Sequence, residues 1–213
     1  MNATKRPNCS KTSGPSAPER PALPMTHPDW NLWLDDYFAR FRPAFDPAVY
    51  ATLVRFRDLA VEVRSRGGKL IFAGNGASAS ISSHGAVDFT KQAKVRAVDF
   101  NEPNLITAFA NDYGYEHWVA RALDCYADPG DVVVLISVSG ASPNIVRAAR
   151  HARELGLKVV TFSGKHADNP LRALGDVNFW IGSAAYNVVE AVHMLWLTTV
   201  IDMVVGRAEY SVN

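Results

Sequence analysis

The chain has 213 residues, of which 48% are hydrophobic and 20% are charged, as is typical of a soluble globular domain that buries a core. Its 22 basic and 21 acidic residues give a net charge of +1, and the absence of a Lys/Arg cluster argues against nucleic acid or anionic lipid as a partner. Cys9 and Cys125 are too far apart in the sequence to form a CxxC metal motif or a disulfide framework, so we expect a reducing, cytoplasmic location.

The first 28 residues differ in composition from the rest of the chain. They contain six of the twelve prolines together with several Ser and Thr residues, and they lack the apolar segment that a secretory signal requires. We therefore predict a disordered tail over residues 1–28, followed by a single domain over residues 29–213.

Residues 30–66 have a helical pattern, because apolar and aromatic side chains recur at intervals of three and four. Pro43 and Pro47 interrupt this pattern, and a second periodic stretch follows over residues 49–63. The sequence therefore predicts two helices before the first strand.

After Gly67 and Gly68, short apolar runs alternate with helical patterns. Strands are expected at residues 70–73, 95–100, 132–136, 159–162 and 177–181. Near-continuous apolar strands separated by helices indicate an α/β fold whose parallel sheet is covered on both faces.

Residues 188–205 form the most apolar long run, which is about the length of a membrane span. The run contains Glu190, His193 and Asp202, and a charge at bilayer depth costs about 2.5 to 3.5 kcal/mol on insertion scales. We expect a helix in the protein core or at a subunit interface.

Two polar loops follow predicted strands. Parallel sheets bind ligands at the carboxyl ends of their strands, where helix N-termini offer unpaired N–H groups to anions. In residues 73–78 ("AGNGAS"), Gly74 and Gly76 allow a close turn and Ser78 stands where the next helix begins.

The second loop, residues 137–142 ("SVSGAS"), directs up to three hydroxyls, those of Ser137, Ser139 and Ser142, into one concavity before a helix that starts with Pro143. Two such loops predict a phosphate cradle without a lysine, although each loop taken alone could be only a helix cap or a tight turn. Neither loop matches the P-loop or the dinucleotide fingerprint, so we expect no nucleotide cofactor.

The segments "GNGASA", "NDYGY" (residues 111–115), "ISVSGAS" and "VVTFSG" (residues 159–164) resemble the sugar isomerase (SIS) domain family, and its phosphoheptose isomerase branch in particular, over about residues 29–206. The resemblance implies a flavodoxin-like three-layer sandwich with a five-stranded parallel sheet, preceded by two helices. It also implies a homotetramer and a phosphosugar ligand. The residues that would bind this ligand are Asn75, Gly76, Ser78, Asp112, Ser137, Ser139, Ser142 and Asn187.

The same resemblance implies a zinc site made of a His and a Glu on the helix after the first loop and a Gln and a His on the last helix. This chain has His84 and Asp88 at the first two positions, four residues apart and so on one helix face. Glu190 stands at the Gln position, and Thr198 stands where the catalytic His is expected. A one-residue shift in the match would place Val189 and Leu197 there instead.

A rearranged site can still be drawn, in which His84, Asp88 and Glu190 hold zinc. Proton transfer would then fall to Asp88, Glu190 or His193. For His193 the competing interpretation is a hydrogen-bonded core residue. Glu190 is expected to face a pocket, a partner or a subunit boundary, because an unpaired buried carboxylate is costly. His117, His151 and His166 are interpreted as surface residues without a supporting constellation.

Two functional hypotheses follow. Aldose–ketose isomerisation through an enediol needs a base near the carbon and a group that stabilises the oxyanion. The first hypothesis is an isomerase that converts sedoheptulose 7-phosphate into a heptose 7-phosphate for lipopolysaccharide or capsule synthesis. The second is a non-catalytic SIS module that binds a phosphosugar or a protein partner, because Thr198 cannot titrate near neutral pH.

Overall fold

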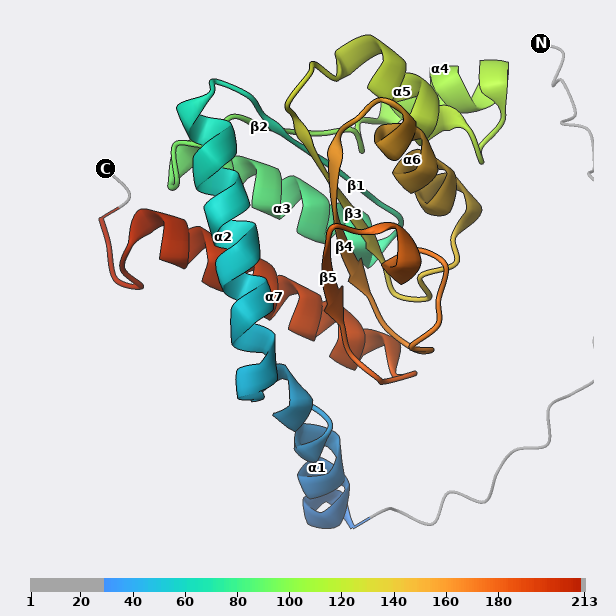
Figure 1. Cartoon of the computed structure of the whole chain (residues 1–213). Coiled ribbons are helices and arrows are strands. Elements are labelled where there is room, and N and C mark those ends of the chain that lie inside the picture. Colours follow the sequence, from blue (N-terminus) through green and yellow to red (C-terminus); the bar gives the residue numbers. More distant parts are fainter. Residues whose placement is uncertain (1–28, 212–213) are drawn as a thin grey trace, which may run out of the picture.

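A computed structural model of the chain describes residues 29–211, and the predicted tail over residues 1–28 lies outside the described residues (Figure 1). The described strands pair as one parallel sheet in the order β2-β1-β3-β4-β5, which confirms the predicted five-stranded parallel sheet. The strands are β1 (Leu70–Gly74), β2 (Ala97–Asp99), β3 (Val132–Ser137), β4 (Lys158–Ser163) and β5 (Val177–Trp180).

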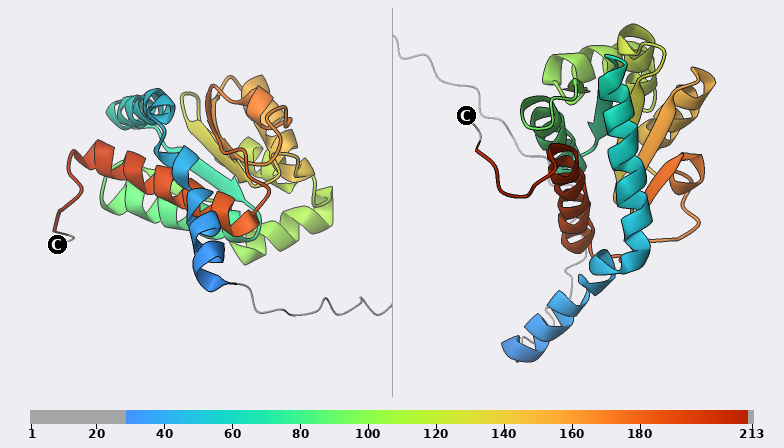
Figure 2. Two further views of the ribbon diagram at one scale, coloured as in Figure 1. Left: turned by 90° about the horizontal axis from the view of Figure 1, so that it is seen from below. Right: turned by 60° about the vertical axis from the view of Figure 1, so that its left-hand side comes forward.

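Helices cover both faces of the sheet, so the predicted three-layer sandwich is confirmed (Figures 1 and 2). One layer contains α2 (Tyr50–Ser65), α3 (Ala77–Lys91) and α7 (Tyr186–Val205), and the other contains α4 (Pro103–Tyr113), α5 (Trp118–Tyr126) and α6 (Pro143–Glu154). Successive side chains of a strand point to opposite faces. Leu70 and Phe72 of β1 therefore join the first core, and Ile71 and Ala73 join the second.

The two predicted N-terminal helices are α1 (Trp30–Ala39) and α2, separated by 3-10 turns at Arg42–Phe45 and Pro47–Val49. Pro43 and Pro47 lie in the first turns of these short elements, where a missing N–H is tolerated. Helix α1, which lies wholly within the described residues, buries none of its side chains and projects from the body of the fold (Figure 2).

Helix α7 is long and apolar enough to cross a membrane by length and composition alone. It lies instead against the sheet and against α2 and α3, with Val188, Val192 and Leu197 fully buried. Its contact with α3 is close, since a Cβ at Gly85 would lie 2.6 Å from Leu197. This packing agrees with the expected core helix.

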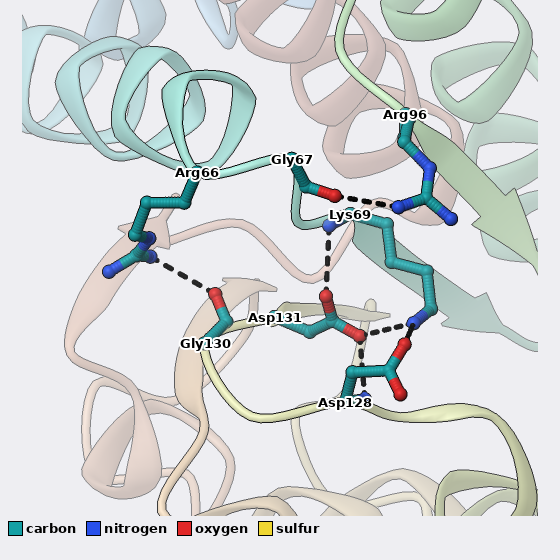
Figure 3. A network of polar contacts seen from close by, with 7 residues as sticks. All are labelled: Arg66, Gly67, Lys69, Arg96, Asp128, Gly130 and Asp131. Atoms are coloured by element: carbon teal, nitrogen blue, oxygen red, sulfur yellow. Dashed lines mark hydrogen bonds and ion pairs between the residues drawn. The ribbon is translucent and has the colours of Figure 1, made fainter.

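A polar network joins the N-terminal ends of β1 and β3, at the opposite end of these strands from the two polar loops (Figure 3). Asp131 accepts hydrogen bonds from the backbone N–H groups of Lys69 (2.9 Å) and Asp128 (2.8 Å). The Lys69 ammonium lies 2.5 Å from both carboxylates. Burial alone would lower the pKa of Lys69, but the hydrogen bonds and charges of Asp128 and Asp131 outweigh burial, and its pKa lies above its usual value.

The strand order places the switch point of the sheet between β1 and β3. The chain leaves β1 toward β2 on one side, whereas β3, β4 and β5 follow on the other side. In a sheet of this order, the crevice for ligands opens at the carboxyl ends of these two strands. Gly74 pairs with Ile136 at that edge, so the two polar loops lie side by side.

Candidate functional site

A pocket of about 140 Å³ lies at the switch point, and we call it the serine pocket. Its lining residues come from the end of β3, from the loops after β1 and β3, and from the starts of α3, α6 and α7. They are Asn75, Ser78, Ile136, Ser137, Val138, Ser139, Ser142, Tyr186 and Glu190. The volume is below the roughly 300 to 1,000 Å³ of pockets that enclose a whole small molecule, so the pocket suits one end of a ligand.

The hydroxyls of the second loop converge as expected. The Ser137 Oγ lies 3.1 Å from the Ser142 Oγ and 3.5 Å from the Ser139 Oγ. Ser142 occupies the N-cap position of α6 without capping the helix through its side chain. Its hydroxyl instead lies against that of Ser137, whereas a serine that served only as a helix cap would accept a hydrogen bond from a backbone N–H of the helix.

Three helix N-termini reach the serine pocket through Ser78 of α3, Ser142 before α6 and Tyr186 of α7. No side chain of the described residues caps any of these three helices. Uncapped helix N-termini present unpaired N–H groups and the positive end of the helix dipole. These helix ends favour an anion over a cation in the pocket.

Glycines allow the loops to pack closely around this pocket. A Cβ at Gly74 would lie 2.6 Å from the backbone of Ser78, so β1 and α3 meet more closely than any side chain would permit. Gly140 has φ +63°, and a Cβ there would lie 2.0 Å from the Asn169 Oδ1. Gly76 occupies the N-cap position of α3 and does not line the pocket itself.

Asn75 belongs to an amide network that sequence reasoning missed. Its side chain and that of Asn144 donate to each other, at 3.0 and 2.9 Å, and the Tyr115 hydroxyl donates to the Asn75 Oδ1 at 3.0 Å. Tyr115 ends the "NDYGY" segment, in which only Asp112 was expected at the site. Asp112 is exposed, bonded by the Asn111 amide, and lies outside the pocket lining.

The predicted metal ligands separate into a pair and a single residue. The Nε2 of His84, which is 51% exposed, lies 3.2 Å from the Asp88 Oδ2, whereas Glu190 lines the serine pocket. His84 follows Ser78 by six residues, or about 9 Å along the helix axis. Within residues 29–211, no three His, Cys, Asp or Glu side chains are grouped so as to hold a metal ion. One chain therefore does not fit the three or four protein ligands that zinc sites use.

The remaining predicted residues of α7 do not point to catalysis. His193 is fully buried, its Nε2 lies 3.1 Å from the Ser163 carbonyl oxygen, and burial lowers its pKa to about 4. This favours the core interpretation over the catalytic one. The Thr198 hydroxyl donates to the carbonyls of Met194 and Leu195 in its own helix. Asn187 is exposed in the first turn of α7.

The described residues that line the serine pocket include no lysine, but Lys165 contacts one of them. The Lys165 Nζ donates to the Tyr186 hydroxyl at 3.0 Å and lies 4.4 Å from the centre of the same ring. Tyr186 lines the pocket. Lys165 directly follows the "VVTFSG" segment at the end of β4, which was the available signal.

A larger groove of about 270 Å³ lies between α5 and α6. There His151 contacts Asp124 (2.5 Å) and Glu154 (3.3 Å), so the expectation that His151 has no constellation was wrong. Burial alone would raise the pKa of Asp124, but the hydrogen bonds and charges of His151 and Arg121 together outweigh burial and hold this pKa below its usual value. Charged side chains that line this groove pair with one another, whereas the serine hydroxyls and helix N-termini at the serine pocket have no such charged partners among the described residues and remain available to a ligand.

Comparisons with known proteins agree with this geometry. Residues 50–164 match the SIS domain family. The phosphoheptose isomerase of Burkholderia pseudomallei is 32% identical over 178 residues, which cover 78% of this chain and 85% of that protein. The solved phosphoheptose isomerase of Neisseria gonorrhoeae has a TM-score of 0.74 and 25% identity, covering 82% of this chain and 99% of that one. Vibrio vulnificus NanR, solved in complex with ManNAc-6P, shares the fold, with a TM-score of 0.63 and 15% identity, covering 84% of this chain and 63% of that one.

Proposed function

Because this chain belongs to the SIS domain family, we propose that it is a phosphosugar isomerase of the phosphoheptose type, which interconverts sedoheptulose 7-phosphate and a heptose 7-phosphate. The observation that carries the proposal is the serine pocket, where clustered hydroxyls meet three uncapped helix N-termini. Relatives named phosphoheptose isomerase that cover most of the chain give further support.

In this proposal, Ser78, Ser137, Ser139 and Ser142 bind the phosphate, and the sugar extends out of the pocket. Glu190 lines the same pocket and is proposed to contact the sugar where it leaves the phosphate. In sedoheptulose 7-phosphate the carbonyl lies at the end of the chain away from the phosphate, so the base is Asp88 of the His84–Asp88 pair. Its carboxylate removes a proton from C1 and returns it to C2, while the proton of the C1 hydroxyl passes to the C2 oxygen, so that the reaction proceeds through an enediol and ends at the aldose.

The far end of the sugar reaches the His84–Asp88 pair in this scheme. His84 lies about 9 Å and Asp88 about 15 Å beyond Ser78 along α3, a spacing that suits an extended phosphosugar better than a short one. Asp112, exposed in the last turn of α4, and Asn187, exposed in the first turn of α7, are proposed to contact sugar hydroxyls. Since the described residues offer only two zinc ligands at this position, we assign no step to a metal.

We further propose a homo-oligomer, a tetramer, that works in the cytoplasm on precursors of lipopolysaccharide or capsule. The support is the surface of α1, where Trp30, Leu32, Trp33 and Phe38 are 45 to 68% exposed. An apolar surface of this kind marks a protein interface, and closed symmetric assemblies are the usual form of such interfaces.

A second candidate function is a SIS module that binds a phosphosugar, or a protein partner, without turnover. It is favoured by two side chains of α7: His193 is buried, and the Thr198 hydroxyl is bonded to its own helix. NanR, solved in complex with ManNAc-6P, has the same fold.

The experiment that separates the two functions is proton NMR of sedoheptulose 7-phosphate with the purified protein in deuterated buffer. Aldose signals and deuterium at the carbon next to the carbonyl support the isomerase, and parallel samples with zinc and with chelator test for a metal. Binding without new signals supports the second candidate. In calorimetry, Ser137→Ala/Ser139→Ala should abolish binding, while Ser65→Ala on α2 should not. Unchanged affinity of the double variant would exclude the serine pocket as the phosphate site.

A further inference from the structure

We propose that Lys165 is a specificity-determining residue that pairs with the anionic end of the ligand in the serine pocket. This inference rests on the proposed phosphosugar function. It assigns to the chain a cation that distinguishes phosphorylated from neutral sugars, next to hydroxyls that by themselves carry no charge.

The backbone of Lys165 is held between α7 and the loop of residues 137–142, which we call the serine loop. The residue before Lys165 is Gly164, and its N–H donates a hydrogen bond to the Val138 carbonyl at 3.0 Å. Val138 stands between Ser137 and Ser139. The Lys165 N–H donates to the Ser183 carbonyl at 3.0 Å, just before α7. Neighbouring Cα atoms are about 3.8 Å apart, and a lysine has a flexible four-carbon stem. The Cα of Lys165 is therefore one residue from the backbone contact with the serine loop, and its side chain is long enough to extend toward the serine hydroxyls.

Close packing below Lys165 keeps it in this position. A Cβ at Gly164 would lie 2.7 Å from the Val189 Cγ1 and 3.0 Å from the Val138 carbonyl oxygen. The end of β4 thus approaches both α7 and the serine loop as closely as a glycine permits. Lys165 directly follows Gly164 in the chain and lies beside the N-terminus of α7.

Two features make this position unfavourable for a lysine in the absence of a ligand. Lys165 has φ +55°, a left-handed conformation that costs a residue with a Cβ free energy and that is found at functional sites. Its ammonium also lies on Tyr186, in the first turn of α7, where the positive end of the helix dipole disfavours a cation.

The charge of Lys165 is not neutralised within the described chain. No carboxylate of residues 29–211 forms an ion pair with it, and its partners are the hydroxyl and ring of Tyr186. A cation–π contact of this kind holds a cation weakly. A phosphate carries about two negative charges at neutral pH, so its entry would relieve the unfavourable dipole and give Lys165 its counter-ion.

Two substitutions of Lys165 test the inference, with Lys158→Met as the matched control. Lys158 lies at the opposite end of β4 and pairs with Asp176 at 3.1 Å. Calorimetry with sedoheptulose 7-phosphate and with inorganic phosphate should show affinity falling about 10- to 100-fold in Lys165→Met, as expected for loss of one charged hydrogen bond. Lys158→Met should bind as the wild type does, and the salt dependence of binding should weaken only in the Lys165 variant.

Lys165→Gly gives a readout that a purely structural role would not produce. Glycine adopts φ +55° without a steric cost, so this variant should melt at a higher temperature while binding phosphate as weakly as Lys165→Met. Wild-type affinity in both Lys165 variants, together with lost binding in Ser137→Ala/Ser139→Ala, would overturn the role of Lys165 and leave the proposed function intact. A wild-type protein that binds no phosphosugar would overturn both.

Discussion

Substitution of Gly140 tests whether the serine loop has the shape described above. Gly140 sits between Ser139 and Ser142 with φ +63°, and its carbonyl accepts a hydrogen bond of 2.9 Å from the Leu171 N–H. In Gly140→Ala, the new methyl group would lie 2.0 Å from the Asn169 Oδ1 and 2.8 Å from the Asn169 Cβ. Because Asn169 is buried, either its side chain or the serine loop must move.

The expected cost has two parts. A left-handed backbone costs about 1 to 2 kcal/mol for a residue with a Cβ. Displacing Asn169 forfeits its hydrogen bonds to the His166 carbonyl (2.8 Å) and the Ser163 hydroxyl (3.2 Å), and the one it accepts from the Arg172 N–H (3.0 Å). At about 1 kcal/mol for each bond, Gly140→Ala should lower the free energy of unfolding by about 4 to 5 kcal/mol.

Urea denaturation measures this loss, and Gly156→Ala is the matched control. Gly156 has φ +73°, but no described atom lies within 4 Å of the position of its Cβ, so only the backbone cost of about 1 to 2 kcal/mol applies. Phosphate binding should also be lost in Gly140→Ala and kept in Gly156→Ala. Equal destabilisation by the two variants would refute the close contact between Gly140 and Asn169.

Three further predictions concern other parts of the molecule. Asp131→Ala should cost about 3 to 5 kcal/mol in urea denaturation, because it leaves the buried Lys69 ammonium with only the exposed Asp128; a loss below about 1 kcal/mol would contradict the network of Figure 3. Unfolded His193 binds a proton near pH 6.5, whereas the folded residue does so only near pH 4, so the unfolded state takes up more protons between these values. Stability should therefore fall by roughly 3 kcal/mol as the pH is lowered from about 6.5 to about 4, and His193→Gln, measured over the same range, should lose this part of the dependence. Asp88→Asn should lower the isomerisation rate about 10²- to 10⁴-fold while phosphosugar binding in calorimetry is kept, and an unchanged rate would exclude Asp88 as the base.

The strands that the sequence predicts best are those with continuous apolar runs. Every residue of β1 and β3 is buried, so composition alone reveals them. The predicted strand over residues 95–100 is longer than β2, because Val95 and Phe100 are apolar core residues that lie outside the stretch paired with β1. Both are buried, but the Val95 N–H donates to the Phe89 carbonyl of α3, and the ladder to β1 joins only residues 97–99. Only tertiary pairing sets that boundary.

The site was predictable where local turn chemistry determines it. The serines stand at strand ends, and the β1–β3 pairing then brings them together. Asn144, Tyr115 and Lys165 escaped prediction because each contact depends on how separate elements pack. The helix spacing that puts His84 and Asp88 together also places them about 9 and 15 Å from Ser78 along the helix axis, and Glu190 is not grouped with them.

The pairing of β1 with β3 also links ligand binding to the completion of folding. These strands are neighbours in the sheet, yet α3, β2, α4 and α5 lie between them in the chain. Closing so long a loop is a slow, non-local step, and the serine pocket does not exist before it. A ligand that binds only this completed arrangement stabilises the whole domain by mass action, so proteases would cut ligand-bound chains less often than free ones.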